Sequence, residues 1–96
     1  MNAREFRQML ARVCEAMGVD FHPGEEVADG SLRFDVVLLY PHHPKGEVDS
    51  FLSIRRHLDL RLDTDEAEAR KIVAGSLNAG IDELESALRG WRIKLE

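Results

Sequence analysis

The chain has 96 residues, 44% of them hydrophobic and 32% charged, and a formal net charge of −5. This length predicts a single domain, residues 1–96, around one hydrophobic core. The single Cys14 cannot form a disulfide within the chain, and no apolar run is long enough for a signal peptide or a membrane span. These observations argue against a disulfide scaffold and a membrane protein, and we expect a cytoplasmic protein with a structural thiol.

A helix is predicted from Ala3 to Met17. Asn2 is a suitable N-cap, Glu5 stands where a capping box requires it, and Gly18 supplies a left-handed stop. Apolar residues recur at helical spacing and form one face, which consists of Phe6, Met9, Leu10, Val13 and Met17.

The segment after this helix carries turn signals. His22-Pro23-Gly24 predicts a turn, and Asp29-Gly30 predicts a tight turn before the next strand. Between them, a short edge strand around residues 26–28 can pair with the strand that follows, and Pro23 keeps it short.

Two longer strands follow. Residues 32–40 are apolar at every even position, and the second half of this segment is apolar on both faces, which is typical of a central strand. Residues 51–62 fit the strand period better than the helical period. In a hairpin with Tyr40 opposite Leu52 the apolar faces align and unlike charges meet, in the pairs Asp35–His57 and Arg33–Asp59. A two-residue slip also opposes unlike charges, so the register stays open.

A long helix is predicted from about Thr64 to Gly90. Its apolar phase continues across Gly80, which favours one helix, kinked at most, over a stop and restart there. After Gly90 the apolar residues alternate, which predicts a final strand over residues 91–95. The order α-β-β-β-α-β predicts an α+β two-layer sandwich, with a mostly antiparallel sheet of three or four strands, an N-terminal helix and one long C-terminal helix on the even face of the hairpin.

This element order is similar to that of the double-stranded-RNA-binding domain. That family needs a basic N-terminus on its second helix, where this chain has Asp63-Thr64-Asp65-Glu66. The resemblance is therefore one of order only. The chain also has no basic stripe with interleaved aromatic residues, so we expect no direct binding to nucleic acid.

The sequence predicts no metal or cofactor site and no enzyme activity. His42 and His43 lie at one end of the hairpin, roughly 15 to 20 Å from His57 at the rise of a strand, so they do not form a metal site together. No glycine-rich phosphate loop or nucleophile–base arrangement is present. Arg56 breaks an apolar strand face. A bulge at Arg55-Arg56 accounts for it best, with an ion pair to a helix carboxylate and an anion site as alternatives.

Two kinds of surface are candidates for protein binding. Val37, Leu39 and Phe51 form an apolar group on the outer face of the hairpin, unless the first helix or the 19–28 segment covers them. Acidic residues form the other candidate surface, and they gather in two separate segments, at Glu25, Glu26 and Asp29 and at Asp65, Glu66 and Glu68. The second group also suits the first turn of a helix, where carboxylates cap free amides.

The function that this pattern favours is a small acidic noncatalytic protein-binding module. We expect it to dock on and occlude a basic, nucleic-acid-handling protein partner, as phage-encoded inhibitors such as anti-CRISPR proteins do. Alternatives are a self-associating structural or assembly protein, such as a phage virion component, and a small-molecule-binding domain that uses Arg56, His57 and Asp59. A homodimer is expected, through the outer apolar group or through paired terminal strands.

Overall fold

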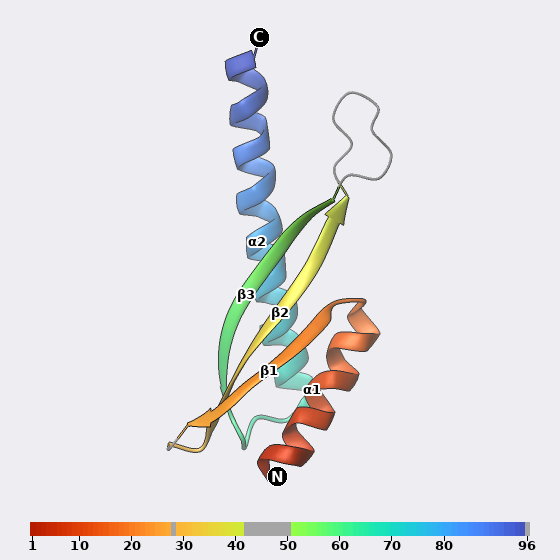
Figure 1. The fold of residues 1–96 in the computed structure, drawn as a ribbon, viewed down its shortest axis with the longest axis vertical. Helices are drawn as coiled ribbons and strands as arrows, with labels where there is room; N and C mark the ends of the chain where they lie inside the picture. The colour runs from red at the N-terminus through yellow and green to blue at the C-terminus, as the bar shows by residue number, and fades with distance from the viewer. Residues whose placement is uncertain (28, 42–50, 96) are drawn as a thin grey trace.

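The computed structural model describes residues 1–27, 29–41 and 51–95, with side chains described outside positions 41, 51 and 90–95. Its elements are, in chain order, α1 (Ala3–Met17), β1 (Asp20–Val27), β2 (Ser31–Pro41), β3 (Phe51–Arg61) and α2 (Glu66–Leu95) (Figure 1). The strands form one antiparallel sheet in the order β1-β2-β3. The fold is therefore the predicted α+β class, with three strands among the described residues.

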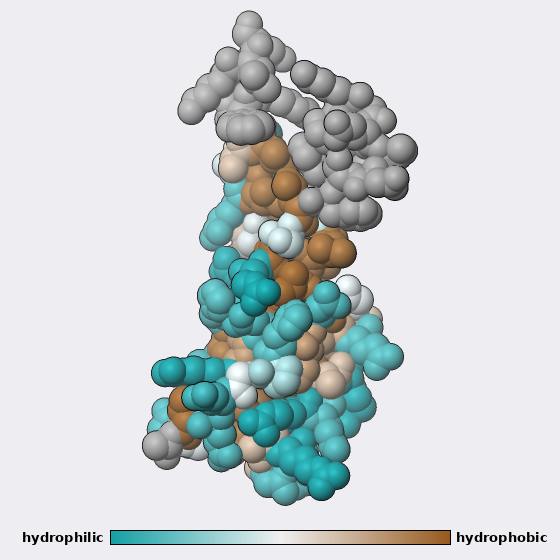
Figure 2. Space-filling model, in the orientation of Figure 1, coloured by the Kyte–Doolittle hydropathy of each residue, from teal (hydrophilic) through white to brown (hydrophobic). Residues whose placement is uncertain are grey.

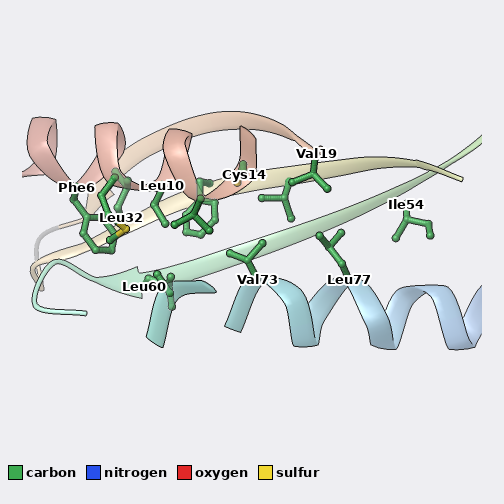
Figure 3. Close-up of a cluster of buried hydrophobic side chains, with 14 residues drawn as sticks. Phe6, Leu10, Cys14, Val19, Leu32, Ile54, Leu60, Val73 and Leu77 are labelled. Carbon is green, nitrogen blue, oxygen red and sulfur yellow. The ribbon is translucent and has the colours of Figure 1, made fainter. Parts of the chain in front are cut away.

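Both helices pack on the same face of the sheet. The buried residues of β2 and β3 that enter the core lie at even positions, and α1 and α2 contribute to the same cluster (Figure 3). The sheet contributes Leu32, Phe34, Val36, Ile54 and Leu60, and the helices contribute Phe6, Met9, Leu10, Val13, Cys14, Ala69, Val73 and Leu77. The predicted location of the long helix on the even face is confirmed.

The predicted N-terminal helix is confirmed with both of its ends. The Asn2 side chain accepts a hydrogen bond from the Glu5 amide at 2.8 Å, and the Glu5 side chain completes the capping box. Gly18 has a φ of 72°, and its amide donates to the carbonyl groups of Cys14 and Glu15. The left-handed residue lets the chain turn directly into β1.

The predicted turn at residues 22–24 is wrong, because β1 is one strand from Asp20 to Val27. The predicted edge strand around residues 26–28 does pair with the strand that follows, at Glu26 and Val27, but it belongs to this longer strand, and residue 28 lies outside the described residues. Pro23 pairs with Phe34, and the register shifts between Pro23 and Glu26. At this irregularity a Cβ on Gly24 would lie 2.5 Å from the Arg33 carbonyl oxygen, so the close approach of the strands requires glycine. The tight turn after β1 is confirmed, since Gly30 has a φ of 81°.

The β2–β3 hairpin has the predicted register, with Tyr40 opposite Leu52, and β2 is the central strand. The pairing continues without irregularity from Ser31–Arg61 to Pro41–Phe51. The predicted bulge at Arg55-Arg56 is therefore wrong, and Arg56 pairs with Val36 on the core face.

The helix α2 continues to Leu95, so the predicted strand over residues 91–95 is wrong. The apolar residues 84, 88, 91 and 95 recur every three or four residues, and this spacing also satisfies a helix. The prediction of one helix across Gly80 is confirmed. Gly80 is buried, and a Cβ there would lie 2.7 Å from Cγ2 of Ile54, so α2 approaches β3 closely at this glycine.

The molecule is elongated, with principal extents of 53 × 23 × 22 Å and a Cα radius of gyration of 16.0 Å. A compact chain of this length would have a radius of gyration of about 12.5 Å. The reason is visible in Figure 1, where α2 and the β2–β3 hairpin extend well beyond α1 and β1. In that extension Tyr40 donates a hydrogen bond of 2.9 Å to Glu85, which joins β2 to α2.

Two glycines of α2 give a matched test of this packing. Gly80→Ala should lower the free energy of unfolding by about 1 kcal/mol or more, because the cost of overpacking exceeds the gain in helix propensity of about 1 kcal/mol. Gly75→Ala is the control, since a Cβ there meets nothing within 4 Å. It should raise stability by about 0.5 to 1 kcal/mol. Urea denaturation measures both, and stabilisation by both alanines would contradict the close approach at Gly80.

Candidate functional site

The two acidic segments converge at one end of the molecule. The Leu62 amide donates a hydrogen bond of 2.9 Å to the Gly30 carbonyl oxygen, which joins the β1–β2 turn to the connection between β3 and α2. Figure 1 shows this turn, the connection and the start of α2 at the same end, and Figure 2 shows hydrophilic residues over much of it. We call this region the acidic end and define it by Glu25, Glu26, Asp29, Asp63, Asp65, Glu66 and Glu68.

Two of the predicted binding acids have structural roles. Asp65 accepts a hydrogen bond of 2.8 Å from the Glu68 amide and so caps the first turn of α2. Glu66 lies 3.3 Å from the Arg12 guanidinium and 4.0 Å from that of Arg70, which ties α1 to α2. These contacts are sufficient to explain both residues.

The other predicted acids are better placed for a partner. Glu25, Glu26, Asp29 and Glu68 are exposed, and no described residue forms an ion pair with their carboxylates. Their charge is therefore directed to solvent from two segments that are distant in sequence. The convergence could not be read from the sequence, because it depends on the turn of the chain at Gly30.

The predicted apolar group lies on the outer face of the sheet. Neither helix covers that face, since both pack on the other one, and Leu39 is 56% exposed while Val37 is half-buried. The side chain of Phe51 and the loop residues His42 and His43 lie outside the described residues. Leu39 is seven residues along β2 from Leu32, the partner of Glu26, which is roughly 23 Å at the rise of a strand. The apolar group and the acidic end are therefore separate surfaces.

A polar cluster occupies the outer face between these surfaces. The Asp35 carboxylate lies 2.7 Å from Nδ1 of His57 and accepts a hydrogen bond of 2.6 Å from the Arg55 guanidinium. The Asp59 carboxylate accepts one of 3.4 Å from Arg33. The predicted oppositions Asp35–His57 and Arg33–Asp59 are thus confirmed. The Arg55–Asp35 contact was missed, although the diagonal neighbour in the predicted register would have indicated it.

This cluster stabilises the charged form of Asp35. The hydrogen bond to His57, followed by the one to Arg55, holds the pKa of the Asp35 carboxyl below its ordinary value. A shallow depression lies over the cluster and is lined by Arg33, Phe34, Asp35, His57, Leu58 and Asp59. The residues pair with one another across the strands, which is the ordinary arrangement for neighbouring charges on an exposed sheet face.

Arg56 lies on the opposite face from His57 and Asp59. Its guanidinium donates a hydrogen bond of 3.0 Å to the Ser76 hydroxyl and lies 3.6 Å from the Glu83 carboxylate, so it binds α2. An ion pair with a helix carboxylate was the alternative explanation for this residue. The suggested small-molecule site of Arg56, His57 and Asp59 is not assembled, because Arg56 lies on the core face whereas His57 and Asp59 lie on the outer face of the sheet.

Cys14 is fully buried in the core, and burial raises the pKa of its thiol to about 11. A neutral, buried thiol is a packing residue and not a nucleophile. Within residues 1–27, 29–41 and 51–95, no group of three or more histidine, cysteine or acidic side chains is placed to hold a metal ion. Neither helix of the described part is long and apolar enough to cross a membrane.

Comparison of the chain with protein-family models, with curated proteins and with solved structures gives no match. The assignment of function therefore depends on the surfaces described above.

The burial of Cys14 has a direct chemical test. At pH 8 the native protein should react with a thiol reagent more than about a hundredfold slower than an exposed cysteine, because little thiolate is present and the sulfur is inaccessible. The chain has one cysteine, so the signal is unambiguous. The same protein in urea is the control and should react fully. Rapid modification of the folded protein would mean that Cys14 is not a core residue.

The polar cluster predicts a specific dependence of stability on pH. Because the pKa of Asp35 is lowered in the folded state, its contribution is complete above the ordinary value of about 3.9 and is lost as the pH falls through the folded-state value. Asp35→Asn should therefore be less stable than wild type near pH 7, and the difference should shrink in acid. Asp82→Asn, which removes an exposed carboxylate of α2, is the control. A difference that stays constant with pH would contradict the role of the Asp35 charge.

Proposed function

We propose that the protein is a noncatalytic protein-binding module that docks on a basic protein through the acidic end and occludes the surface it covers. The observation that carries the proposal is the convergence of two acid-rich segments, distant in sequence, on one end of the molecule. Exposed carboxylates grouped in this way raise the rate at which a positively charged partner arrives in the right orientation.

The negative charge of the acidic end also indicates the class of partner. Exposed carboxylates repel the phosphates of nucleic acid, whereas a protein that itself handles nucleic acid offers a basic surface of complementary charge. The proposal therefore has the module compete with nucleic acid for such a protein. Small acidic phage-encoded inhibitors, anti-CRISPR proteins among them, act by this kind of occlusion, and we propose the same class and a cytoplasmic location here.

A noncatalytic mode of action agrees with the chemistry of the polar residues. The outer-face cluster consists of cross-strand pairs, Arg56 binds α2, and the thiol of Cys14 is buried. Each of these groups has a structural role that explains it. Within the acidic end, the side chains of Glu25, Glu26 and Asp29 form no ion pair with a described residue.

The proposal predicts binding that is steered by charge. The protein is used to capture partners from its native host, and association with the captured protein is followed by surface plasmon resonance at two salt concentrations. Glu25→Lys/Glu26→Lys should slow association about tenfold or more at low salt and much less at moderate salt. Stability should change by less than about 0.5 kcal/mol, since both side chains are exposed.

A variant with the same change in charge serves as the control. Glu15→Lys/Asp82→Lys also replaces two exposed carboxylates, on α1 and α2, away from the acidic end. It should associate at nearly the wild-type rate. Equal slowing by both variants would show a response to net charge alone. Salt-independent association of the wild-type protein, left unchanged in the Glu25/Glu26 variant, would overturn the electrostatic docking.

A further inference from the structure

The two edges of the sheet differ in how they are protected. The outer edge of β1 carries Pro23, a register shift and two exposed glutamates, which are features that prevent further strand pairing. The edge strand β3 has no proline and no register shift, and its pairing to β2 is regular over its whole length. Its exposed charges, at Arg55, Asp59 and Arg61, are of both signs. No other described strand pairs with its outer edge. A regular edge of this length, without proline or a bulge, can accept an added strand whose charges are complementary.

The backbone groups available at this edge can be identified. The Leu62 amide donates to the Gly30 carbonyl, which makes 30 and 62 a hydrogen-bonded pair. Such pairs alternate along an antiparallel ladder, so the even residues of β3 bond to β2. The odd residues direct their N–H and C=O groups outward, from Ser53 to Asp59. The same alternation holds on β2, where the carbonyl group of Arg33, an odd residue, points at Gly24 of β1 and not at β3.

We infer that β3 pairs antiparallel with β3 of a second copy of this chain, around a twofold axis between the two His57 residues. This arrangement places odd residues opposite odd residues, so their outward backbone groups exchange hydrogen bonds. It joins two three-stranded sheets into one sheet of six strands. The surface is distinct from the acidic end, and the inference does not depend on the proposed function.

Charge complementarity selects this register. With the axis at His57, Arg55 lies opposite Asp59 of the second copy, and the symmetry makes this pair twice. Both side chains are about half exposed and can reach across the edge. An axis at Arg56 would place the two Arg56 residues opposite each other, and an axis at Leu58 would oppose Arg55 to Arg61. Like charges directly opposite are unfavourable, so the neighbouring registers are disfavoured.

The core face is compatible with the same register. Ile54 lies opposite Leu60 of the second copy, so apolar side chains of the core face meet on each side of the axis. Arg56 lies opposite Leu58 between these pairs.

Complementary charge variants test the pairing by sedimentation equilibrium. The wild-type protein should be a dimer at tens of micromolar. Arg55→Asp opposes acid to acid and Asp59→Arg opposes base to base, so each variant alone should dimerise about tenfold or more weakly. An equimolar mixture of the two restores both unlike pairs and should dimerise as wild type does. A monomeric wild type, dimeric single variants or a mixture that stays monomeric would each overturn the inference.

Cysteine cross-linking tests the register without changing those charges. His57→Cys places two thiols on the axis with Cα atoms about 5.5 Å apart, within reach of a disulfide, so oxidation should give a covalent dimer. Ser53→Cys lies on the same exposed face of β3, but its two copies would be roughly 26 Å apart and should not cross-link. Buried Cys14 gives no background. Cross-linking at residue 53 in place of 57 would exclude this axis. Binding to the basic partner is measured separately at Glu25 and Glu26, so failure of one proposal is distinguishable from failure of the other.

Discussion

The regular pairing of β2 with β3 is the constraint on which the rest of the molecule depends. Eleven residue pairs match without a bulge, so the apolar even positions of both strands lie on one face throughout. A slip of one residue would turn those side chains to the opposite face and remove the surface on which both helices pack. Both helices pack on this one apolar face and lie side by side, and the Arg12–Glu66 ion pair links them.

This arrangement also determines what is left for binding. Because both helices use the even face, the odd face carries a polar cluster of cross-strand pairs, with exposed Leu39 beyond it. The acidic end arises where the β1–β2 turn meets the start of α2, and the regular edge of β3 remains unpaired among the described strands. The candidate surfaces are thus the parts of the sheet and its turns that the core does not require.

The sequence predicted the elements whose signals are local and repeated. The capping box at Asn2 and Glu5, the tight turn at Gly30 and the alternation of β2 and β3 all have one structural solution, and the hairpin register followed from aligning apolar faces. The predictions were wrong where a local sequence pattern is compatible with two secondary structures. Pro23 marks a turn in most contexts but also fits the outer edge of a strand, and the alternation of residues 91–95 also continues a helical stripe.

Contacts made by tertiary packing could not be predicted. A charge on an apolar strand face has no local partner, so the sequence favours a bulge at Arg56. Ser76 and Glu83 become its partners only when α2 crosses β3. The Tyr40–Glu85 hydrogen bond and the meeting of the acidic segments depend on the same packing. For the site, the sequence predicted the exposed acidic residues. The structure shows that Glu25, Glu26 and Asp29 are not among the acids that stabilise α2.

The elongated shape implies that stability is unevenly distributed along the long axis. Near α1 the core is closed by two helices and a sheet, and its side chains are fully buried, as at Phe6, Val36 and Val73. Farther along, α2 lies on the hairpin alone, and Leu38, Ile81 and Leu84 are only partly buried. Local opening needs less free energy where fewer apolar contacts are lost. Amide hydrogen exchange should therefore be slowest in the N-terminal half of α2 and become progressively faster beyond Gly80, so that one continuous helix behaves as two segments of different protection.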